Sequence, residues 1–201
     1  MSLPQYAFIS ESAYLAAEKD GSRRHEYVAG RVYAMAGASK LHARIAGNLF
    51  YRIRSTMGES GCLVVQNDLK VRVRQESVFY YPDVVVTCLP DEEELYYTEK
   101  PCFIAEVLSP GTETIDRREK VLAYRCIPNL KVYVLADSHR RHVEYFIRDA
   151  NNAWRCALLE DREILHVDCE ALTFTLTLNQ IYEHVSFNAG VAEEPAAYGV
   201  G

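Results

Sequence analysis

Two short apolar segments of this chain are each interrupted by one acidic residue, and this feature constrains the fold most. Asp83 stands in YPDVVVTC, and Glu106 stands in CFIAEVL. Nearly continuous apolar runs of this length are typical of central strands that are covered on both faces of a sheet. A carboxylate inside such a strand is costly unless it has a partner, a metal ion or a shifted pKa. Both acids therefore require a chemical explanation.

The spacing of the two segments predicts how they pair. If they form an antiparallel pair, a symmetric register sets three pairs opposite each other: Asp83 with Glu106, Val85 with Ile104, and Thr87 with Cys102. Opposed side chains lie about 4.5 to 5.5 Å apart at Cβ, where two carboxylates repel each other. A divalent cation reverses that repulsion, and Mg²⁺ prefers oxygen ligands, so the pair predicts a site for Mg²⁺ or Mn²⁺. The alternatives are a register slip, which would separate the acids, and salt-bridged acids at strand ends.

Periodic apolar positions predict three helices. Residues 8–20 form the first, which Ser10 can cap, and residues 39–57 form the second, with an apolar residue every four positions from Leu41 to Ile53. Residues 112–126 form the third. Its apolar stripe is predicted to contain Ile115, Leu122 and Cys126.

Alternating and apolar segments between the helices predict strands. HEYVAGRVYAMAG resembles a hairpin that turns at Ala29-Gly30. The further strand segments are CLVVQ, NDLKVRVRQ, YPDVVVTC, CFIAEVL, KVYVLAD, HVEYFIRD, AWRCALL and the region of LTFTLTL. This order predicts one mixed sheet flanked by helices, of the α/β or α+β class, with extra C-terminal strands. Residues 1–185 are expected to form a single domain and residues 186–201 a flexible tail.

Composition bounds the environment of the chain. At 201 residues one core suffices, and neither a leader nor a membrane-spanning segment is evident, so we expect a cytoplasmic protein. Six cysteines lack any CxxC pair and mostly lie in apolar runs, which predicts buried reduced thiols and no zinc site. The net charge of -6 opposes nonspecific attraction to nucleic acid. Such binding would need a local basic patch.

Two basic faces could supply that patch. Lys40 and Arg44, with Arg52 and Arg54, lie in the second predicted helix, where no acid occurs between residues 39 and 57. Lys70, Arg72 and Arg74 alternate with valines, so they are predicted to share one face of a strand. The basic face of the helix has two interpretations, an ordinary solvated surface or a contact with phosphates.

Several ordered segments together resemble a known family of bacterial proteins of unassigned function, abundant in cyanobacteria and classed as restriction endonucleases with the PD-(D/E)xK fold. The similarity spans roughly residues 8–137. It rests on HEYVAGRVYAMAG with SKLHARIAGNL, on YPDVVV, and on IAEVLSPGTETIDRREKVLAYRCIPNLKVYVLAD. The resemblance implies a restriction-endonuclease-like mixed sheet and a metal-dependent phosphodiesterase site.

The resemblance also implies roles for individual residues. Asp83 and Glu106 match the two motif acids, both metal ligands, and the Val107 carbonyl is a further candidate ligand. Glu26 matches an N-terminal glutamate of the family that could complete the acidic cluster, although a surface ion pair is its alternative. The motif lysine normally follows the second acid by two residues, and here that position is Leu108.

Lys120 is the best substitute for the missing lysine. The family pattern of Asp, Lys and Tyr at four-residue spacing appears as Asp116, Lys120 and Tyr124. An ammonium group there could orient the attacking water or offset charge on the phosphate. An ordinary helix salt bridge between Asp116 and Lys120 is the alternative. His42 matches a family histidine that could contact phosphate or cap local polar groups.

These inferences predict an Mg²⁺- or Mn²⁺-dependent endonuclease that hydrolyses phosphodiester bonds in nucleic acid, with DNA as the expected substrate. Lys40, His42, Arg44, Arg72 and Arg74 are the candidate nucleic-acid contacts. Cutting both strands would require two sites, so a homodimer is expected. Two rivals remain open: a noncatalytic nucleic-acid or protein binding module that retains the fold, and a hydrolase of small phosphoesters.

Overall fold

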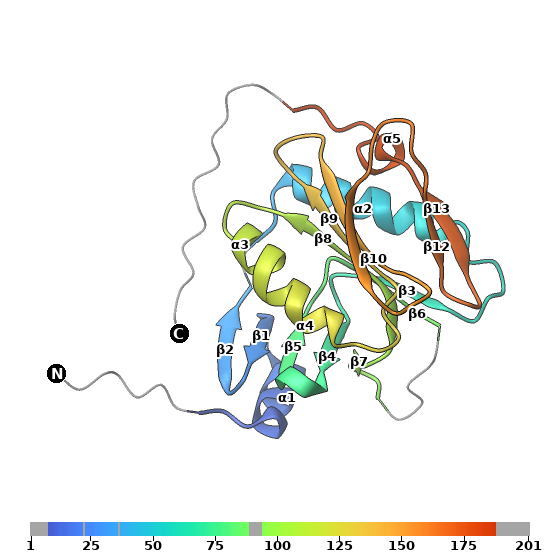
Figure 1. Cartoon of the computed structure of the whole chain (residues 1–201). Helices are drawn as coiled ribbons and strands as arrows, with labels where there is room; N and C mark the ends of the chain where they lie inside the picture. Colours follow the sequence, from blue (N-terminus) through green and yellow to red (C-terminus); the bar gives the residue numbers. More distant parts are fainter. Residues whose placement is uncertain (1–7, 22, 36, 89–93, 188–201) are drawn as a thin grey trace.

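The fold is described from a computed structural model, which covers residues 8–21, 23–35, 37–88 and 94–187. Strands and helices combine in a mixed α+β architecture, as predicted (Figure 1). The expectation of one mixed sheet is wrong, because the strands within the described residues form three sheets of six, five and two strands. The predicted tail, 186–201, lies almost wholly outside the described residues. The single-domain assignment of residues 1–185 stays a prediction.

The six-stranded sheet contains both acid-bearing segments at its centre. Its order is β11-β10-β9-β8-β6-β3, and its strands are β3 (Leu63–Gln66), β6 (Val84–Thr87), β8 (Pro101–Leu108), β9 (Val132–Asp137), β10 (Val143–Arg148) and β11 (Trp154–Leu158). Every residue of β6 and β8 is buried. β8 pairs with β6 antiparallel and with β9 parallel. The prediction that the two segments are neighbouring central strands is confirmed.

The predicted register between β6 and β8 is confirmed over most of its length. Val85 lies opposite Ile104, as expected. At the other end of the pair a bulge places Thr87 opposite Pro101, so the predicted pairing of Thr87 with Cys102 is wrong. A bulge inserts one extra residue and shifts only the ladder beyond it. The end that contains the acids keeps the symmetric register.

The five-stranded sheet has the order β2-β1-β5-β4-β7, with β1 (His25–Val28), β2 (Arg31–Ala34), β4 (Lys70–Val73), β5 (Val78–Tyr80) and β7 (Tyr97–Thr98). The predicted hairpin is present, and its two turn residues, Ala29 and Gly30, both have positive φ, 45° and 91°. Left-handed values at both central positions are what a tight two-residue hairpin turn requires. Neither β5 nor β7 was predicted from the sequence.

The strand predicted for NDLKVRVRQ ends earlier than expected. The short 3₁₀ turn η1 (Arg74–Glu76) follows β4, so Arg74 does not continue the strand face. Lys70 is buried, and its ammonium group donates to the Tyr81 hydroxyl at 3.2 Å. The prediction that Lys70, Arg72 and Arg74 share one basic strand face is therefore wrong at Arg74, and Lys70 is buried.

The first two helices agree with the sequence. α1 (Glu11–Asp20) begins at Ser10, whose side chain accepts from the backbone N–H of Ala13. α2 (Lys40–Arg54) begins after Ser39, which caps it in the same way. The buried side of α2 contains Ile45, Leu49 and Ile53, three members of the predicted apolar stripe. Side-chain capping and a period near four residues were sufficient to locate both helices.

The third predicted helix exists, but its buried face differs from the prediction. It consists of α3 (Glu113–Ile115), the π-helical turn η2 (Asp116–Lys120) and α4 (Val121–Arg125). Leu122 is 66% exposed and Cys126 is exposed, so the predicted stripe is wrong. The buried residues are Asp116 and Lys120 of η2 together with Val121, Ala123 and Tyr124 of α4. The helical segment therefore buries two charged side chains beside apolar ones.

The central sheet separates two cores. On one face α2 packs with the hairpin β12 (Leu165–Asp168) and β13 (Thr173–Leu176) and with α5 (Leu178–Ile181), gathered at the upper right of Figure 1. On the other face α4 packs between the six- and five-stranded sheets. Because strand side chains alternate, Ile104 and Leu108 of β8 face α4 while Ala105 and Val107 face α2. Glu106 therefore faces the helical segment that contains η2.

The cysteines depart from the sequence analysis. Disulfides join Cys62 to Cys88 and Cys102 to Cys169, while Cys126 and Cys156 are free and exposed. The prediction of buried reduced thiols is wrong in both respects, because pairing between β3 and β6 and the return of the β12–β13 hairpin bring distant cysteines together. Because disulfides replace the predicted reduced thiols, the cysteines no longer support the predicted cytoplasmic location. No helix in the described parts of the chain is long and apolar enough to cross a bilayer.

Candidate functional site

Asp83 and Glu106 lie side by side where β6 begins and β8 ends. The backbone N–H of Asp83 donates to Glu106 Oε2 at 3.4 Å. One carboxylate oxygen of Asp83, Oδ2, accepts from the backbone N–H of Val107 at 2.7 Å. The two acids therefore converge, as the antiparallel register predicted.

Lys120 joins the acids from the opposite side. Its Nζ lies 3.1 Å from Glu106 Oε1, 2.9 Å from Glu26 Oε1 and 3.1 Å from Asp116 Oδ1. The lysine comes from η2, and π-helical turns inside α-helices occur frequently at functional sites. The interaction with Asp116 is the predicted i,i+4 pair, but it is buried and shared with two further carboxylates. It is not an ordinary surface salt bridge.

The space that a lysine at position 108 would occupy is filled differently. Leu108 is 2% exposed and packs in the core next to α4. It lies on the same face of β8 as Glu106, because strand residues two apart share a face. Lys120 reaches that face from the helix that covers it. The ammonium group therefore comes from the covering helix instead of from the strand.

Glu26 belongs to the same cluster. Besides its contact with Lys120, its Oε1 accepts from the backbone N–H of Tyr81 at 3.3 Å. Its side chain is 15% exposed. The alternative of a surface ion pair for Glu26 is wrong.

His42 approaches from α2. Its Nε2 lies 2.9 Å from Asp83 Oδ1, and both side chains are largely buried. The backbone N–H of His42 donates to Ser39, the cap of the helix, so the start of α2 fixes the position of the ring. The two oxygens of Asp83 are thus held by one histidine and one backbone amide.

Burial dominates the electrostatics of the cluster. Removal from water raises the pKa of Glu106 well above its usual value; Lys120 opposes this rise, and Asp116, Asp83 and Glu26 add to it. Burial alone would lower the pKa of Lys120, but Asp116, Glu106 and Glu26 outweigh it and raise that pKa well above its usual value. Lys120 is therefore held in its charged form.

The cluster lines a pocket of about 770 Å³. The charged residues of the cluster that line it are Glu26, Asp83, Glu106, Asp116 and Lys120. Pockets of about 300 to 1,000 Å³ are typical of ligand sites. The acids are therefore accessible to a ligand that enters this pocket.

Comparison with known proteins identifies the family. The family described as "Uma2: Putative restriction endonuclease" matches residues 12–179. This chain belongs to the Uma2 family. The match includes every residue of the cluster, and it confirms the resemblance inferred from the ordered sequence segments.

Relatives of this Uma2 chain occur in cyanobacteria. It is 30% identical to "Uncharacterized protein slr1290" of Synechocystis sp. over 180 residues, 89% of this chain and 94% of the relative. It is 28% identical to "Uncharacterized protein sll1609" of the same organism over 150 residues, 73% of this chain and 84% of the relative.

A solved structure has the same fold. It is described as a putative nuclease belonging to DUF820 from Anabaena variabilis, and it superimposes with a TM-score of 0.66 at 14% identity, covering 87% of this chain and 97% of the other. At that identity the similarity establishes the fold. Together with the family match, it supports a nuclease-like protein.

The predicted nucleic-acid contacts of this Uma2 chain lie mostly outside the pocket. Arg72 pairs with Glu11 and Glu99, and Arg74 pairs with Glu99. Arg44 donates to the backbone carbonyl of His184 at 2.9 Å. Of the predicted residues, His42 lines the pocket, and Lys40 is exposed two positions earlier at the start of α2.

Two residues of the cluster were named in the sequence pattern without being assigned to the site. Tyr124 donates from its hydroxyl to Glu106 Oε1 at 3.2 Å. Asp116 is 2% exposed and contacts Lys120. Their four-residue spacing with Lys120 was the available signal, since residues at i and i+4 share a helix face.

Proposed function

We propose that this chain is a metal-dependent endonuclease that hydrolyses phosphodiester bonds in DNA. The observation that supports the proposal best is the convergence of Asp83, Glu106 and Lys120 on one pocket. Two acids and a lysine are the functional groups of a PD-(D/E)xK site. Leu108 occupies the usual lysine position, and the helix that covers the strand supplies the ammonium group of Lys120.

The side chains present fit a divalent cation. The carboxylates of Glu26, Glu106 and Asp116 contact the single ammonium group of Lys120, and Asp83 lies next to Glu106, so acidic groups outnumber the lysine. Asp116 Oδ1 is buried and, among the described residues, has no hydrogen-bond partner despite its proximity to Lys120. Clustered oxygen donors of this kind suit Mg²⁺ or Mn²⁺. Asp83, Glu106 and the Val107 carbonyl would hold the ion, with Glu26 completing the acidic cluster.

When bound, the cation would polarise the scissile phosphate and acidify a water molecule. Lys120 would orient the attacking water and offset the negative charge that develops on the phosphate. Glu26 and Asp116 act as positioning residues, because they hold the Lys120 ammonium. His42 likewise acts as a positioning residue, because its Nε2 contacts Oδ1 of Asp83.

The substrate is proposed from the site and from the family description. The pocket volume of about 770 Å³ leaves room for a phosphodiester, and Lys40 is an exposed basic residue two positions before His42. Two sites would be required to cut both strands, which a twofold homodimer would supply. Sedimentation of the purified chain measures that state directly, and a monomer at assay concentration would overturn it.

A nicking assay on supercoiled DNA with Mg²⁺ or Mn²⁺ tests the proposed function. Glu106→Gln is expected to lower the rate at least about 100-fold, because loss of one charge-stabilising group in an active site typically costs 10² to 10³. Glu160→Gln is the matched control, since Glu160 is exposed and should retain the wild-type rate. If the Glu106→Gln preparation nicked DNA at the same rate as wild type, a contaminating nuclease would be the source of the activity. Metal binding without any cutting would favour the noncatalytic binding module.

Metal affinity should depend on pH. Burial raises the pKa of Glu106 well above its usual value, and a carboxylate must be deprotonated to bind a metal. Mn²⁺ binding should therefore tighten as pH rises, by about tenfold per pH unit below that pKa for one displaced proton, and level off above it. Calorimetric titrations between acidic and weakly alkaline pH measure the profile. A flat profile would contradict Glu106 as a ligand.

A further inference from the structure

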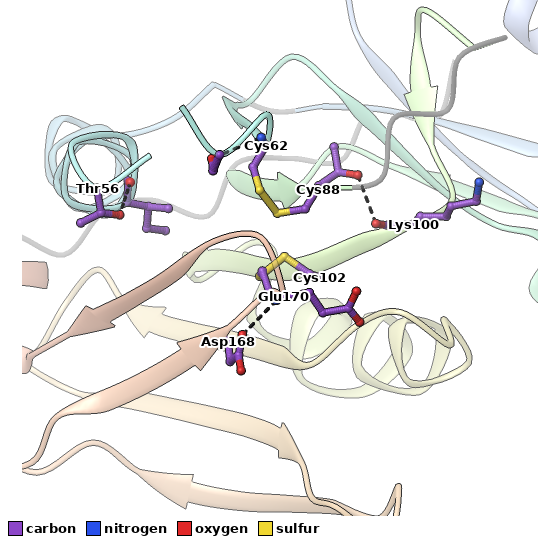
Figure 2. Close-up of a disulfide and its surroundings, with 11 residues drawn as sticks. Thr56, Cys62, Cys88, Lys100, Cys102, Asp168 and Glu170 are labelled. Atoms are coloured by element: carbon purple, nitrogen blue, oxygen red, sulfur yellow. Dashed lines mark hydrogen bonds between the residues drawn. A yellow bond between two sulfur atoms is a disulfide. The ribbon is translucent and has the colours of Figure 1, made fainter. Parts of the chain in front are cut away.

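Two disulfides lie next to each other at the end of the central sheet that lies away from the acids. Cys88 follows β6 and Cys102 lies near the start of β8, whereas Asp83 and Glu106 occupy the opposite ends of these strands. The Sγ atoms of Cys88, Cys102 and Cys169 all lie within 4.8 Å of one another. Cys62 is bonded to Cys88, so the two disulfides are adjacent, as Figure 2 shows. The group is separate from the proposed catalytic pocket.

The surroundings of these sulfurs form a small enclosed site. Cys62, Cys102 and Cys169 are buried, at 6%, 7% and 2% exposure. A hollow of about 20 Å³ is lined by Cys88, Cys102 and Cys169, which is room for a single ion or water molecule. Two independent structural disulfides have no need to share such a hollow.

Four further residues line the hollow, namely Lys100, Asn129, Lys131 and Glu170. Figure 2 shows that the side chain of Lys100 points away from the sulfurs. Four thiolates around one divalent cation have a net charge of -2. The cysteine sulfurs, and not the surrounding charges, therefore define the candidate site.

We propose that, after a dithiol reductant has opened both disulfides, Cys62, Cys88, Cys102 and Cys169 together bind one Zn²⁺ ion. Two dithiol molecules are each oxidised to a disulfide, and each passes two electrons and two protons to one protein disulfide. Four thiols result, and Zn²⁺ displaces their protons as it binds. The ion is expected to be tetrahedral, with Zn–S distances of about 2.3 Å.

The chemistry of the sulfurs selects the metal. Thiolates are soft ligands that favour zinc over the magnesium and manganese of the oxygen site. Tetrahedral Zn–S bonds of about 2.3 Å place the sulfurs about 3.8 Å apart. The sulfurs of Cys88, Cys102 and Cys169 already lie within 4.8 Å of one another, and Cys62 is bonded to Cys88, so side-chain movements can reach that geometry once the two S–S bonds are broken. The fold thus brings the ligands together before the metal arrives.

Cobalt titration tests the proposal. Co²⁺ replaces Zn²⁺ in such sites and gives thiolate charge-transfer absorption in the near ultraviolet together with intense tetrahedral bands in the visible. The protein is reduced with a phosphine, freed of reductant under nitrogen, and titrated with Co²⁺ in excess Mg²⁺, which occupies the oxygen site. A Cys126→Ser/Cys156→Ser background removes the two exposed thiols. We expect one equivalent of Co²⁺ with these bands, bleached by one equivalent of Zn²⁺.

Paired variants identify the ligands. We expect Co²⁺ binding to weaken at least about 100-fold in each of two double variants, Cys102→Ser/Cys169→Ser and Cys62→Ser/Cys88→Ser. Substitution of residues that only support metal ligands typically costs 10- to 100-fold in affinity, so loss of two ligands should cost more. Co²⁺ binding without thiolate bands, or bands that survive either pair, would overturn the proposal and leave two structural disulfides. If the reduced chain loses its circular dichroism signal, Zn²⁺ should restore it. Failure of Zn²⁺ to restore it would equally overturn the proposal.

Discussion

An Asp83→Asn variant is expected to lose measurable Mn²⁺ binding at the acidic pocket and at least about 100-fold in DNA nicking rate. Both oxygens of Asp83 are already oriented, one by His42 and the other by the Val107 amide. Changes to residues that merely orient metal ligands typically cost 10- to 100-fold in affinity or activity, so loss of a ligand should cost more. Calorimetry and the nicking assay on one preparation measure both effects.

The matched control for this variant is Asp68→Asn. Asp68 lines the same pocket, but its side chain is 65% exposed and pairs with Arg24. It should bind Mn²⁺ like wild type. If Asp83→Asn binds Mn²⁺ as tightly as Asp68→Asn does, the acids are not a metal site.

Replacing Lys120 with methionine is expected to destabilise the fold by about 3 to 5 kcal/mol, the usual cost of removing one partner of a buried ion pair. Glu106 and Asp116 have 5% and 3% of their side chains exposed, and Lys120 is the cation that they share with Glu26. At temperatures below the melting transition, the nicking rate should also fall at least about 100-fold. Urea unfolding monitored by circular dichroism measures the free energy.

A double-mutant cycle separates the lost charge from general damage. Adding Glu106→Gln to Lys120→Met should recover part of the stability, because one uncompensated carboxylate is removed. Lys19→Met, at an exposed lysine of α1, should stay within about 0.5 kcal/mol of wild type. Strict additivity of the two changes would mean that Lys120 does not balance Glu106.

The carboxylate pair could be predicted because the relevant constraints are local and periodic. One acid in each of two apolar runs marks buried strands, and alternation within the strands fixes which face each acid occupies. The symmetric register of β6 and β8 then places Asp83 beside Glu106. The register shift at Thr87 could not be predicted from the two segments, because a bulge depends on contacts beyond the two strands.

The buried face of the third helix could not be obtained in the same way. Hydrophobic periodicity favoured Leu122 and Cys126 as core positions, yet both are exposed. The helix buries Asp116, Lys120 and Tyr124 because Lys120 contacts Glu26 and Glu106, which lie on the strands that the helix covers, and Tyr124 donates to Glu106. Charge compensation between distant segments outweighed the local apolar pattern.

The sequence by itself determined the central strands, the first two helices, the hairpin and the pairing of Asp83 with Glu106, because strand alternation, helical period and capping are short-range properties. Only the tertiary structure decided that Lys120 contacts Glu106 from the covering helix and that two disulfides lie next to each other at the far end of the sheet. Both depend on helices and hairpins crossing the sheet from far along the chain. Such packing is set by the sum of many weak contacts, which no local pattern encodes.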